Sequence, residues 1–391
     1  MIPTVTLKKN HDNRLKKGHL WIYSNEIDKI SDPILQGEVV RVLNAKGESF
    51  GLGFYNPNSL IAVRLLSADE ISSPAEFLLE RFSVAKKYRE NLFPGSTSYR
   101  FIFGESDFLP GLVIDRYGNY FSVQILSSGM ELWLDSIKKS QLQIFPETLG
   151  IVEKNKSKLR ELEGLELREG IIWGDVPERI LMNENGIQYE ISLLDGQKTG
   201  YFLDQKPNRQ RIQELASGKS VLDCFTNQGG FALNAAKGGA KHVLGIDISD
   251  RAIESCRKNA NLNSLKNVLF QTADVFDFLK EESEKQSEWD MIILDPPSFT
   301  KSKKNVPSAK KGYAEINRMA LNLLPQHGFL VTASCSHHIF EDTFLDIIHQ
   351  ESVSAGRQLR LVFRGNQSPD HPILQSMPET QYLKFFIFEV I

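Results

Sequence analysis

The sequence predicts an α/β fold, with a doubly wound, mostly parallel sheet in the carboxyl-terminal half and two smaller regions before it. From about residue 196, short apolar runs alternate with segments of helical spacing. Such alternating strand–helix units give a parallel sheet with helices on both faces. The chain of 391 residues also exceeds what one hydrophobic core usually serves, so we expect more than one domain.

The two regions before this sheet have different patterns. Residues 1–72 alternate short β-type runs with Gly, Asn and Pro turns, which predicts a small β-rich module. Residues 73–195 begin with a linker helix near Pro74 and continue as an α+β domain with a hairpin turn at 117–119. Residues 196–391 form the third region, and we expect its last two strands to pair as an antiparallel hairpin at the sheet edge.

Composition excludes several classes of protein. The hydrophobic content of 41% and charged content of 24% are ordinary for a soluble globular chain. We find no apolar run long enough to span a bilayer and no signal-peptide core. Three cysteines without paired spacing argue against a disulfide framework and against a Cys-rich zinc site, and no metal is expected. The sequence therefore indicates a reducing, cytoplasmic compartment.

An acidic residue follows each of the first four apolar runs of the third region. Ligands of doubly wound sheets bind beyond the carboxyl ends of the strands, so these acids would line one rim of one cleft. One aspartate in such a place is more often a helix N-cap or a turn residue, but four in register favour a ligand site. The four are Asp223, Asp247, Asp274 and Asp295.

The first of these acids opens the loop TNQGGF, which lets the backbone pass close to a ligand. An acid there repels a phosphate but suits an ammonium group. Asp247 is placed to accept hydrogen bonds from ribose hydroxyls, Asp274 to face an adenine amine, and Asp295 to border the same ligand. A cofactor with an ammonium, a ribose and no phosphate is S-adenosylmethionine. Its expected site also includes Phe225, Thr226, Asn227, Gly229, Ile248 and Val275.

The motif DPPSF begins at Asp295 and follows the fourth apolar run. Its two prolines fix φ and remove two backbone donors, which would hold the carboxylate rigidly over the cleft. A rigid acid beside an aromatic ring suits the gripping of an extruded nucleobase. The alternative is a proline turn that only ends a strand. We expect Pro296, Pro297 and Phe299 to contact the base.

Charge is distributed unevenly although the formal net charge is only −3. Residues 1–20 carry five basic side chains against one acid, and residues 301–311 carry five lysines and no acid. Each cluster alone is more often a solvated surface, but two local basic patches are compatible with nucleic-acid binding. The expected RNA contacts are Lys16, Lys17, Lys301, Lys303 and Lys304.

Several longer motifs extend this interpretation. They are LKKGHLWIYSNEI, GEVVRV, LPGLVIDRYG, GQKTGYFLDQ, VLDCFTNQGGF, LDPPSF, GYAEINRMALNLL and SCS. In them the sequence resembles class I S-adenosylmethionine-dependent rRNA methyltransferases with an N-terminal PUA domain, which methylate carbon 5 of a cytosine in large-subunit rRNA. The resemblance implies a PUA RNA-binding domain, a central α+β domain and a Rossmann-like domain with a seven-stranded sheet. It also implies that Lys198 and Gln205 help to close the cofactor site.

Cys335 stands between two serines after the apolar run GFLVTA, so it should overlook the same cleft as Asp295. Carbon 5 of cytosine is a poor nucleophile, and a thiolate that adds at carbon 6 activates it. Asp295 near the ring nitrogen could supply or share a proton. The alternative for Cys335 is a buried small hydrophobe, but its position at the strand end favours a nucleophile.

Of the remaining cysteines, Cys256 is expected on the core face of a helix, and Cys224 is expected to pack beside the cofactor loop. In two-cysteine RNA cytosine methyltransferases a second cysteine lies in the proline motif, where this chain has Ser298. The group that removes the carbon 5 proton is therefore unassigned.

Three other functions stay open. Methylation of an exocyclic amine, such as guanine N2, would need no cysteine. A nicotinamide oxidoreductase is disfavoured by Asp223 and by the lack of GxGxxG. A non-enzymatic RNA-binding protein is the third. The sequence identifies neither the nucleotide nor whether free rRNA or a subunit is the substrate, and it allows a homodimer without requiring one.

Overall fold

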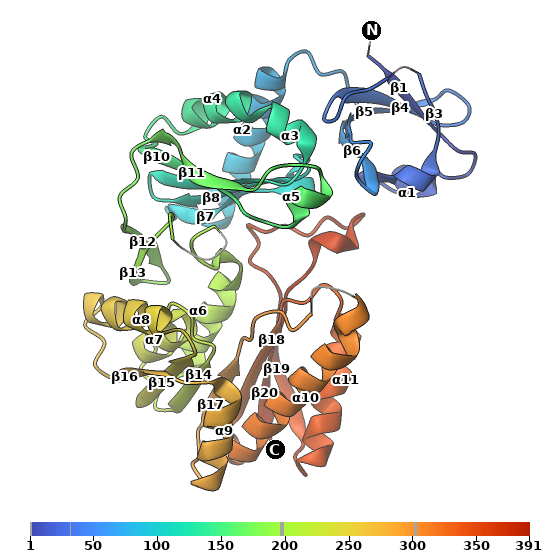
Figure 1. Ribbon diagram of the computed structural model, residues 1–391. Coiled ribbons are helices and arrows are strands. Elements are labelled where there is room, and N and C mark those ends of the chain that lie inside the picture. Colours follow the sequence, from blue (N-terminus) through green and yellow to red (C-terminus); the bar gives the residue numbers. More distant parts are fainter. Residues whose placement is uncertain (1, 32, 196–198, 301–302) are drawn as a thin grey trace. The chain divides into compact units, whose positions relative to one another are not determined.

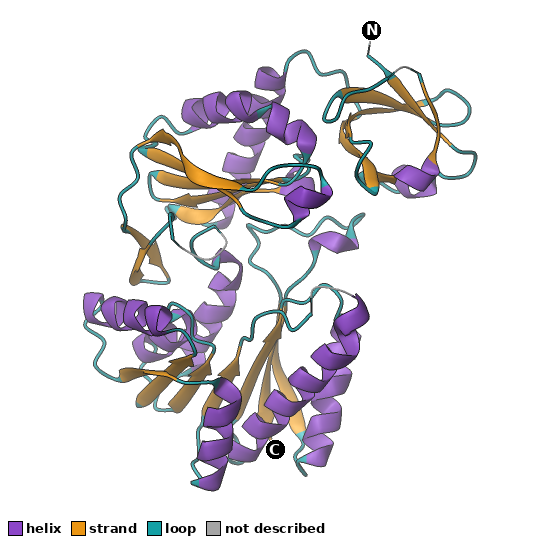
Figure 2. Cartoon of the chain, in the orientation of Figure 1, coloured by secondary structure: helices purple, strands orange, loops and turns teal. Residues whose placement is uncertain are grey.

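The computed structural model describes residues 2–31, 33–195, 199–300 and 303–391 (Figures 1 and 2). Contacts within the chain divide it into two compact units. Unit 1 comprises Met1–Met182, Ile191–Leu203 and Pro369–Thr380, and unit 2 comprises Asn183–Glu190, Asp204–Ser368 and Gln381–Ile391. Each unit therefore contains segments that are distant in the sequence.

The beginning of unit 1 is a six-stranded sheet with the order β2-β6-β5-β4-β1-β3. Strand β1 pairs antiparallel with β3 and parallel with β4. Alternate residues of β4 are buried, as expected for a strand with one face on a core. This confirms the β-rich start of the chain. The elements are β1 (Thr4–Leu7), α1 (Asn13–Lys16), β2 (Trp21–Tyr23), η1 (Ser24–Glu26), β3 (Ile27–Ile30), β4 (Val39–Leu43), β5 (Ser49–Tyr55) and β6 (Ile61–Ser67).

A second, five-stranded sheet with the order β11-β10-β9-β8-β7 follows. The predicted linker helix α2 begins at Pro74, where the Ser73 hydroxyl accepts a hydrogen bond from the Glu76 N–H. The hairpin β8–β9 closes between Tyr117 and Tyr120 as predicted. The elements are α2 (Pro74–Leu92), β7 (Ser98–Phe103), η2 (Gly104–Asp107), β8 (Leu112–Tyr117), β9 (Tyr120–Ile125), α3 (Ser128–Leu132), α4 (Leu134–Ile144), β10 (Gly150–Asn155), α5 (Leu159–Leu162), β11 (Arg168–Gly174), and the two-stranded sheet of β12 (Ile180–Glu184) and β13 (Ile187–Ile191).

Unit 2 contains the predicted doubly wound sheet, with seven strands in the order β16-β15-β14-β17-β18-β20-β19. All pairs are parallel except those of β20, which is antiparallel to β18 and β19. The chain runs outward from β14 to both sides, so the strand order reverses between β14 and β17. A ligand cleft is expected at this switch point.

The elements of this unit follow one another as strand and helix. They are η3 (Leu203–Gln205), α6 (Lys206–Leu215), β14 (Ser220–Cys224), α7 (Gly230–Lys237), β15 (His242–Asp247), α8 (Asp250–Leu262), β16 (Val268–Thr272), α9 (Val275–Glu284), β17 (Met291–Leu294), η4 (Lys303–Asn305), α10 (Val306–Leu323), β18 (Phe329–Ser334), α11 (Glu341–Ser354), β19 (Leu359–Gly365), η5 (Pro378–Thr380, in unit 1) and β20 (Lys384–Val390).

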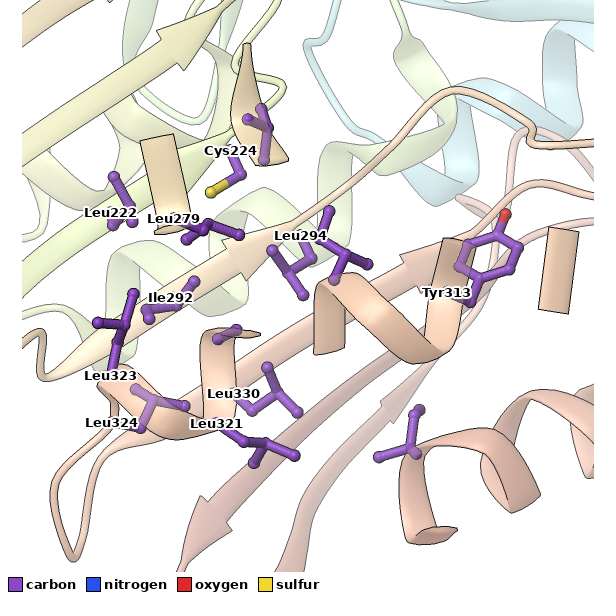
Figure 3. Packing of buried hydrophobic residues seen from close by; sticks show 14 of the residues in the cluster. Leu222, Cys224, Leu279, Ile292, Leu294, Tyr313, Leu321, Leu323, Leu324 and Leu330 are labelled. Carbon is purple, nitrogen blue, oxygen red and sulfur yellow. The ribbon is translucent and has the colours of Figure 1, made fainter. Parts of the chain in front are cut away.

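Helices α9, α10 and α11 pack against the sheet in one hydrophobic core (Figure 3). On α10 the residues Ala309, Tyr313, Ile316 and Ala320 are buried at a spacing of three or four, which is the period of a helix face. Cys224 lies in this core beside leucines. Cys256 is buried on α8, as predicted, and both cysteines are used for packing.

Within the ranges that the structure describes, no helix is long and apolar enough to cross a membrane. The same ranges hold no group of three His, Cys, Asp or Glu side chains that could bind a metal ion.

Candidate active site

Asp223 at the end of β14 organises the loop that follows it. Its Oδ2 accepts hydrogen bonds from the Thr226 hydroxyl at 2.6 Å and from the Ala232 N–H at 2.9 Å. The side chain is only 1% exposed, and desolvation raises the pKa of this carboxyl to about 7. Asp223 therefore ties the loop to the start of α7, and its contact with a ligand ammonium stays a prediction.

The backbone of this loop turns through left-handed conformations. Phe225, Asn227 and Gly229 have φ of 64°, 51° and 83°, a region that side chains rarely adopt and glycine adopts freely. A Cβ on Gly229 would meet Leu233 at 3.2 Å and the Cys256 Sγ at 3.4 Å. A side chain at this position would therefore strain the backbone and crowd the residues packed beneath the loop.

Asp247 at the end of β15 has its carboxylate oriented by two backbone amides. Its Oδ2 accepts from the Asn227 N–H and its Oδ1 from the Ser249 N–H, each at 3.0 Å. The side chain is half-buried, and each carboxylate oxygen can accept further hydrogen bonds. The next residue, Ile248, is 71% exposed and offers an apolar surface beside this acid.

Asp274 is the N-cap of α9. This is the structural role that the sequence left open for a single aspartate after a strand. Its Oδ1 accepts from the N–H groups of Phe276 and Asp277, while the side chain is exposed. The neighbouring Val275 is buried in the core below α9. A contact of either residue with adenine stays a prediction.

Asp295 follows β17 directly and is half-buried, with Pro296 buried and Pro297 exposed after it. The ring of Phe299 lies 4.7 Å from that of Tyr313, centroid to centroid, and packs on the core of α9 and α10. Part of the Phe299 ring is therefore used for packing, and its stacking on a base stays a prediction.

Cys335 follows β18, the neighbour of β17, and its thiol is half-buried. Because β17 and β18 are parallel, with Leu294 beside Thr332, both strands end at the same edge of the sheet. Cys335 and Asp295 are thus the first residues beyond two adjacent strand ends. Burial raises the pKa of the Tyr313 phenol, and charges on Cys335 and Asp295 raise it further, so both groups lie within electrostatic reach of this hydroxyl.

A cluster of hydroxyl groups connects the two loops. The Ser298 Oγ of the proline motif lies 2.9 Å from the Ser336 Oγ, which lies 3.1 Å from the Tyr313 hydroxyl. The Ser334 hydroxyl donates to the same Tyr313 oxygen at 3.0 Å. The serines on both sides of Cys335 are therefore fixed by α10 and by the DPPSF loop.

Sequence reasoning missed Lys384, the first residue of β20. Its Nζ donates to the carbonyl oxygens of Ser336 at 2.7 Å and Tyr382 at 2.8 Å. Burial lowers the pKa of this ammonium to about 8, and a negative charge on Cys335 acts in the opposite direction. The signal in the sequence was a single lysine at the start of the otherwise apolar run KFFIF.

The other predicted site residues are dispersed. Gln205 is buried and accepts a hydrogen bond from the Asn208 side chain at 2.6 Å. Lys16 pairs with Asp12 at 2.8 Å, and Lys17 and Lys304 are exposed. Lys303 begins η4. Lys198 and Lys301 lie outside the described residues.

The two halves of this sheet edge suit different chemistry. Around β14 and β15, an oriented carboxylate, an exposed isoleucine and a loop with left-handed backbone fit a nucleoside that carries ribose hydroxyls. Around β17 and β18, a half-buried thiol, a carboxyl group and a buried ammonium fit nucleophilic and proton-transfer chemistry. The residues present therefore fit S-adenosylmethionine on one side and a reacting base on the other.

Comparisons with known proteins identify two parts of the chain. Residues 5–68 match the model of a PUA-like domain, and residues 170–387 match that of an S-adenosylmethionine-dependent methyltransferase. Two relatives are each named ribosomal RNA large subunit methyltransferase I. The one from Aliivibrio fischeri is 36% identical and the one from Vibrio parahaemolyticus 37% identical, each over 100% of both chains.

Solved structures show the same architecture. A putative S-adenosylmethionine-dependent methyltransferase from Streptococcus mutans has a TM-score of 0.85 at 25% identity, over 100% of both chains. A putative methyltransferase complexed with SAH has a TM-score of 0.86 at 26% identity, again over 100% of both chains. The chain therefore belongs to the S-adenosylmethionine-dependent methyltransferases, with a PUA-like domain at its N-terminus.

Proposed function

We propose that this protein methylates large-subunit rRNA at carbon 5 of a cytosine, with Cys335 as the nucleophile. The names of the full-length relatives support rRNA as the substrate. The observation that carries the choice of base is the position of Cys335 and Asp295 beyond two adjacent parallel strands. Methylation of an amine would not need a thiol at that place, because an amine lone pair reacts directly.

The cofactor residues of the proposal are those around β14 and β15. When bound, S-adenosylmethionine supplies an electrophilic methyl group. Asp247 accepts hydrogen bonds from the ribose hydroxyls, and Ile248 covers the adenine. Asp223 holds the loop from Thr226 to Ala232 in the conformation that admits the cofactor. Lys198 and Gln205 are proposed to close the site.

The reaction begins with a bond from the Cys335 thiolate sulfur to carbon 6 of the base. The electron pair of the carbon 5–carbon 6 double bond would then form the bond from carbon 5 to the methyl group, whose bond to the sulfonium sulfur of the cofactor would break. Asp295 shares a proton with the ring nitrogen and so limits the charge on the adduct. Loss of the carbon 5 proton re-forms the double bond and expels the thiolate. In sum, one proton is exchanged for one methyl group, and the enzyme is regenerated.

The RNA contacts of the proposal come from two regions. Pro296, Pro297 and Phe299 of the proline motif hold the extruded base next to Asp295. Basic side chains at Lys16 and Lys17 on the PUA-like domain, together with those of the lysine-rich segment after residue 300, contact phosphates. PUA-like sequence at residues 5–68 supports this division of labour.

Substitution of Cys335 by alanine tests the proposal directly. The variant should lose methyl transfer while its cofactor affinity, measured by calorimetry, stays within a few-fold of the unchanged protein. RNA that contains 5-fluorocytosine should form a covalent adduct with the unchanged protein, because fluorine cannot leave carbon 5 as a proton does. Cys335→Ala retains Cys224 and Cys256, so the loss of the adduct in this variant would assign the bond to Cys335.

The site of modification is tested in cells. Mass spectrometry of rRNA from cells that lack the protein should show one missing methyl group on a large-subunit cytosine. A missing mark on a guanine amine, or full activity of Cys335→Ala, would replace the carbon 5 mechanism by direct attack of an amine.

A further inference from the structure

Lys384 is a buried cation next to the proposed nucleophile. It is 5% exposed and lies on β20, directly opposite Ser334 of β18 in the antiparallel register. Its Nζ donates to the carbonyl oxygen of Ser336, the residue after Cys335. The ammonium therefore lies at the backbone that carries the thiol.

Burial of a lysine ammonium beside this loop costs hydration free energy. Four of the next five residues of β20 are buried and apolar, and a charge in such surroundings loses its hydration. Two of the three N–H groups of the ammonium go to the carbonyls of Ser336 and Tyr382. The third has no acceptor among the described residues, so it is available to an anion that forms beside it. A neutral donor would satisfy the two carbonyls at a lower desolvation cost.

We propose that Lys384 is the positioning residue that activates Cys335, because its ammonium stabilises the thiolate and fixes the loop from which the thiolate attacks. This rests on the proposed role of Cys335 as a nucleophile. A cation next to a thiol favours the thiolate and so increases the reactive fraction at neutral pH. Because burial brings the pKa of Lys384 to about 8, the ammonium is charged below that pH and loses its effect above it.

Other ionisable groups near Cys335 act in different directions. Asp295 after β17 is an acid whose charge disfavours a second anion, and the Tyr313 hydroxyl of α10 is held neutral by burial. His337, two residues on, is exposed, and its ring lies tilted against that of Tyr382, at 5.6 Å between ring centroids. Among these groups of the described part of the chain, Lys384 is a buried cation, and its charge is opposite to that of Asp295.

The pH dependence of alkylation tests the role of the charge. Iodoacetamide is added to the full chain without RNA or cofactor, and modification of the Cys335 peptide is followed by mass spectrometry between pH 5 and 10. In Lys384→Gln, which keeps N–H donors but removes the charge, the apparent thiol pKa should rise, and alkylation at pH 7 should slow about tenfold. Lys384→Arg should restore the rate to within about threefold of the unchanged protein.

A second readout separates activation from mere support of the loop. A structural role would change the limiting rate at high pH and leave the apparent thiol pKa unchanged in Lys384→Gln, and that result would overturn the proposal. Lys154→Gln is the matched control, since Lys154 is also 5% exposed but lies on β10 of unit 1. It should leave the whole pH profile of Cys335 unchanged.

If Lys384→Gln does not fold, as judged by thermal melting, the Arg variant still decides. Lys384→Arg keeps the charge and should therefore keep the low pKa of the Cys335 thiol. A thiol pKa in folded Lys384→Arg as high as that of an ordinary unfolded cysteine would contradict activation by charge. The measurement does not depend on RNA. Methylation by Cys335→Ala would refute the proposed function, whereas an unshifted thiol pKa would refute only the role of Lys384.

Discussion

The two halves of the sheet edge are built in different ways. At β14 and β15, Asp223 shapes the cofactor loop through contacts with residues close in sequence, Thr226 and Ala232, while Asn227 also contacts Asp247, 20 positions on. At β17 and β18, the contacts join distant residues: Ser298 meets Ser336, and Lys384 reaches back to Ser336. The first half rests on one loop and the adjacent strand end, whereas the second forms only when several strands and α10 have assembled.

The two halves also differ in what holds them. Backbone amides orient Asp247, and backbone conformation sets the path of the cofactor loop. Around Cys335, side-chain hydroxyls and one ammonium hold the loop in place instead. Substitutions at the first half should therefore change cofactor affinity and stability, whereas those at the second should change the rate of the chemical step.

After the loss of transfer expected for Cys335→Ala, the largest effect is expected for Asp295→Asn, which keeps the shape of the side chain but removes the acid. Methyl transfer at saturating substrates should fall about 10²- to 10⁴-fold, the usual contribution of a positioned acid or base. Cofactor affinity should change less than tenfold. Single-turnover assays and calorimetry measure the two quantities separately.

The matched control for that substitution is Asp290→Asn. Asp290 precedes β17 and accepts hydrogen bonds from Ser220 at the amino end of the sheet. Equal losses of rate in both variants would mean that Asp295 supports the fold and not the reaction, and the contrast between the halves would disappear.

The next largest effect is expected on the free energy of unfolding, through Asp223 in the half of the sheet edge at β14 and β15. The pKa of Asp223 is raised in the folded state to about 7, so folding favours its protonated form. The resulting stabilisation is complete below the unfolded pKa near 4 and is lost as pH rises through 7. Asp223→Asn cannot ionise, so its unfolding free energy relative to the unchanged protein should increase by a few kcal/mol between pH 4 and pH 8. Urea denaturation at the two pH values measures this difference, and parallel pH profiles would contradict it.

A smaller effect is expected for Gly229→Ala. The left-handed φ of 83° should cost about 1–2 kcal/mol with a Cβ present, and the Cβ would also crowd Leu233 and Cys256. Cofactor affinity should fall together with stability. Gly218→Ala is the control, because Gly218 has a φ of 73° but open space around it. A similar loss of cofactor affinity in both variants would show that the strain acts through global stability and not through the loop.

The local character of the cofactor half explains why the sequence predicted it. An acid after each apolar run and the TNQGGF loop identify strand ends that are read from consecutive residues. The left-handed φ values of Phe225 and Asn227 escaped prediction, because neither is a glycine. Asp274 shows the limit of the pattern, since the same residue type after a strand here caps α9.

At β17 and β18, where we place the reacting base, only the two residues at the strand ends were predictable from the sequence. Asp295 and Cys335 each follow an apolar run, and parallel strands bring such ends to one edge. The packing of Phe299 on Tyr313 and the reach of Lys384 to Ser336 depend on pairings across 14 and 48 positions. No local pattern specifies these contacts, because they follow from the strand order of the assembled sheet.

The smallest effect should come from the lysine-rich segment, which belongs to neither half. Replacing Lys301, Lys303 and Lys304 by glutamine should lower the slope of log affinity for RNA against log salt by about 2, since each lost phosphate contact with single-stranded RNA contributes about 0.7. Methyl transfer at saturating RNA should stay unchanged. Filter binding at several salt concentrations measures the slope. The control replaces Lys241, Lys258 and Lys266 of unit 2, which are exposed. If both triple variants lower the slope equally, RNA responds to the total charge of the protein, and the segment is not a specific part of the interface.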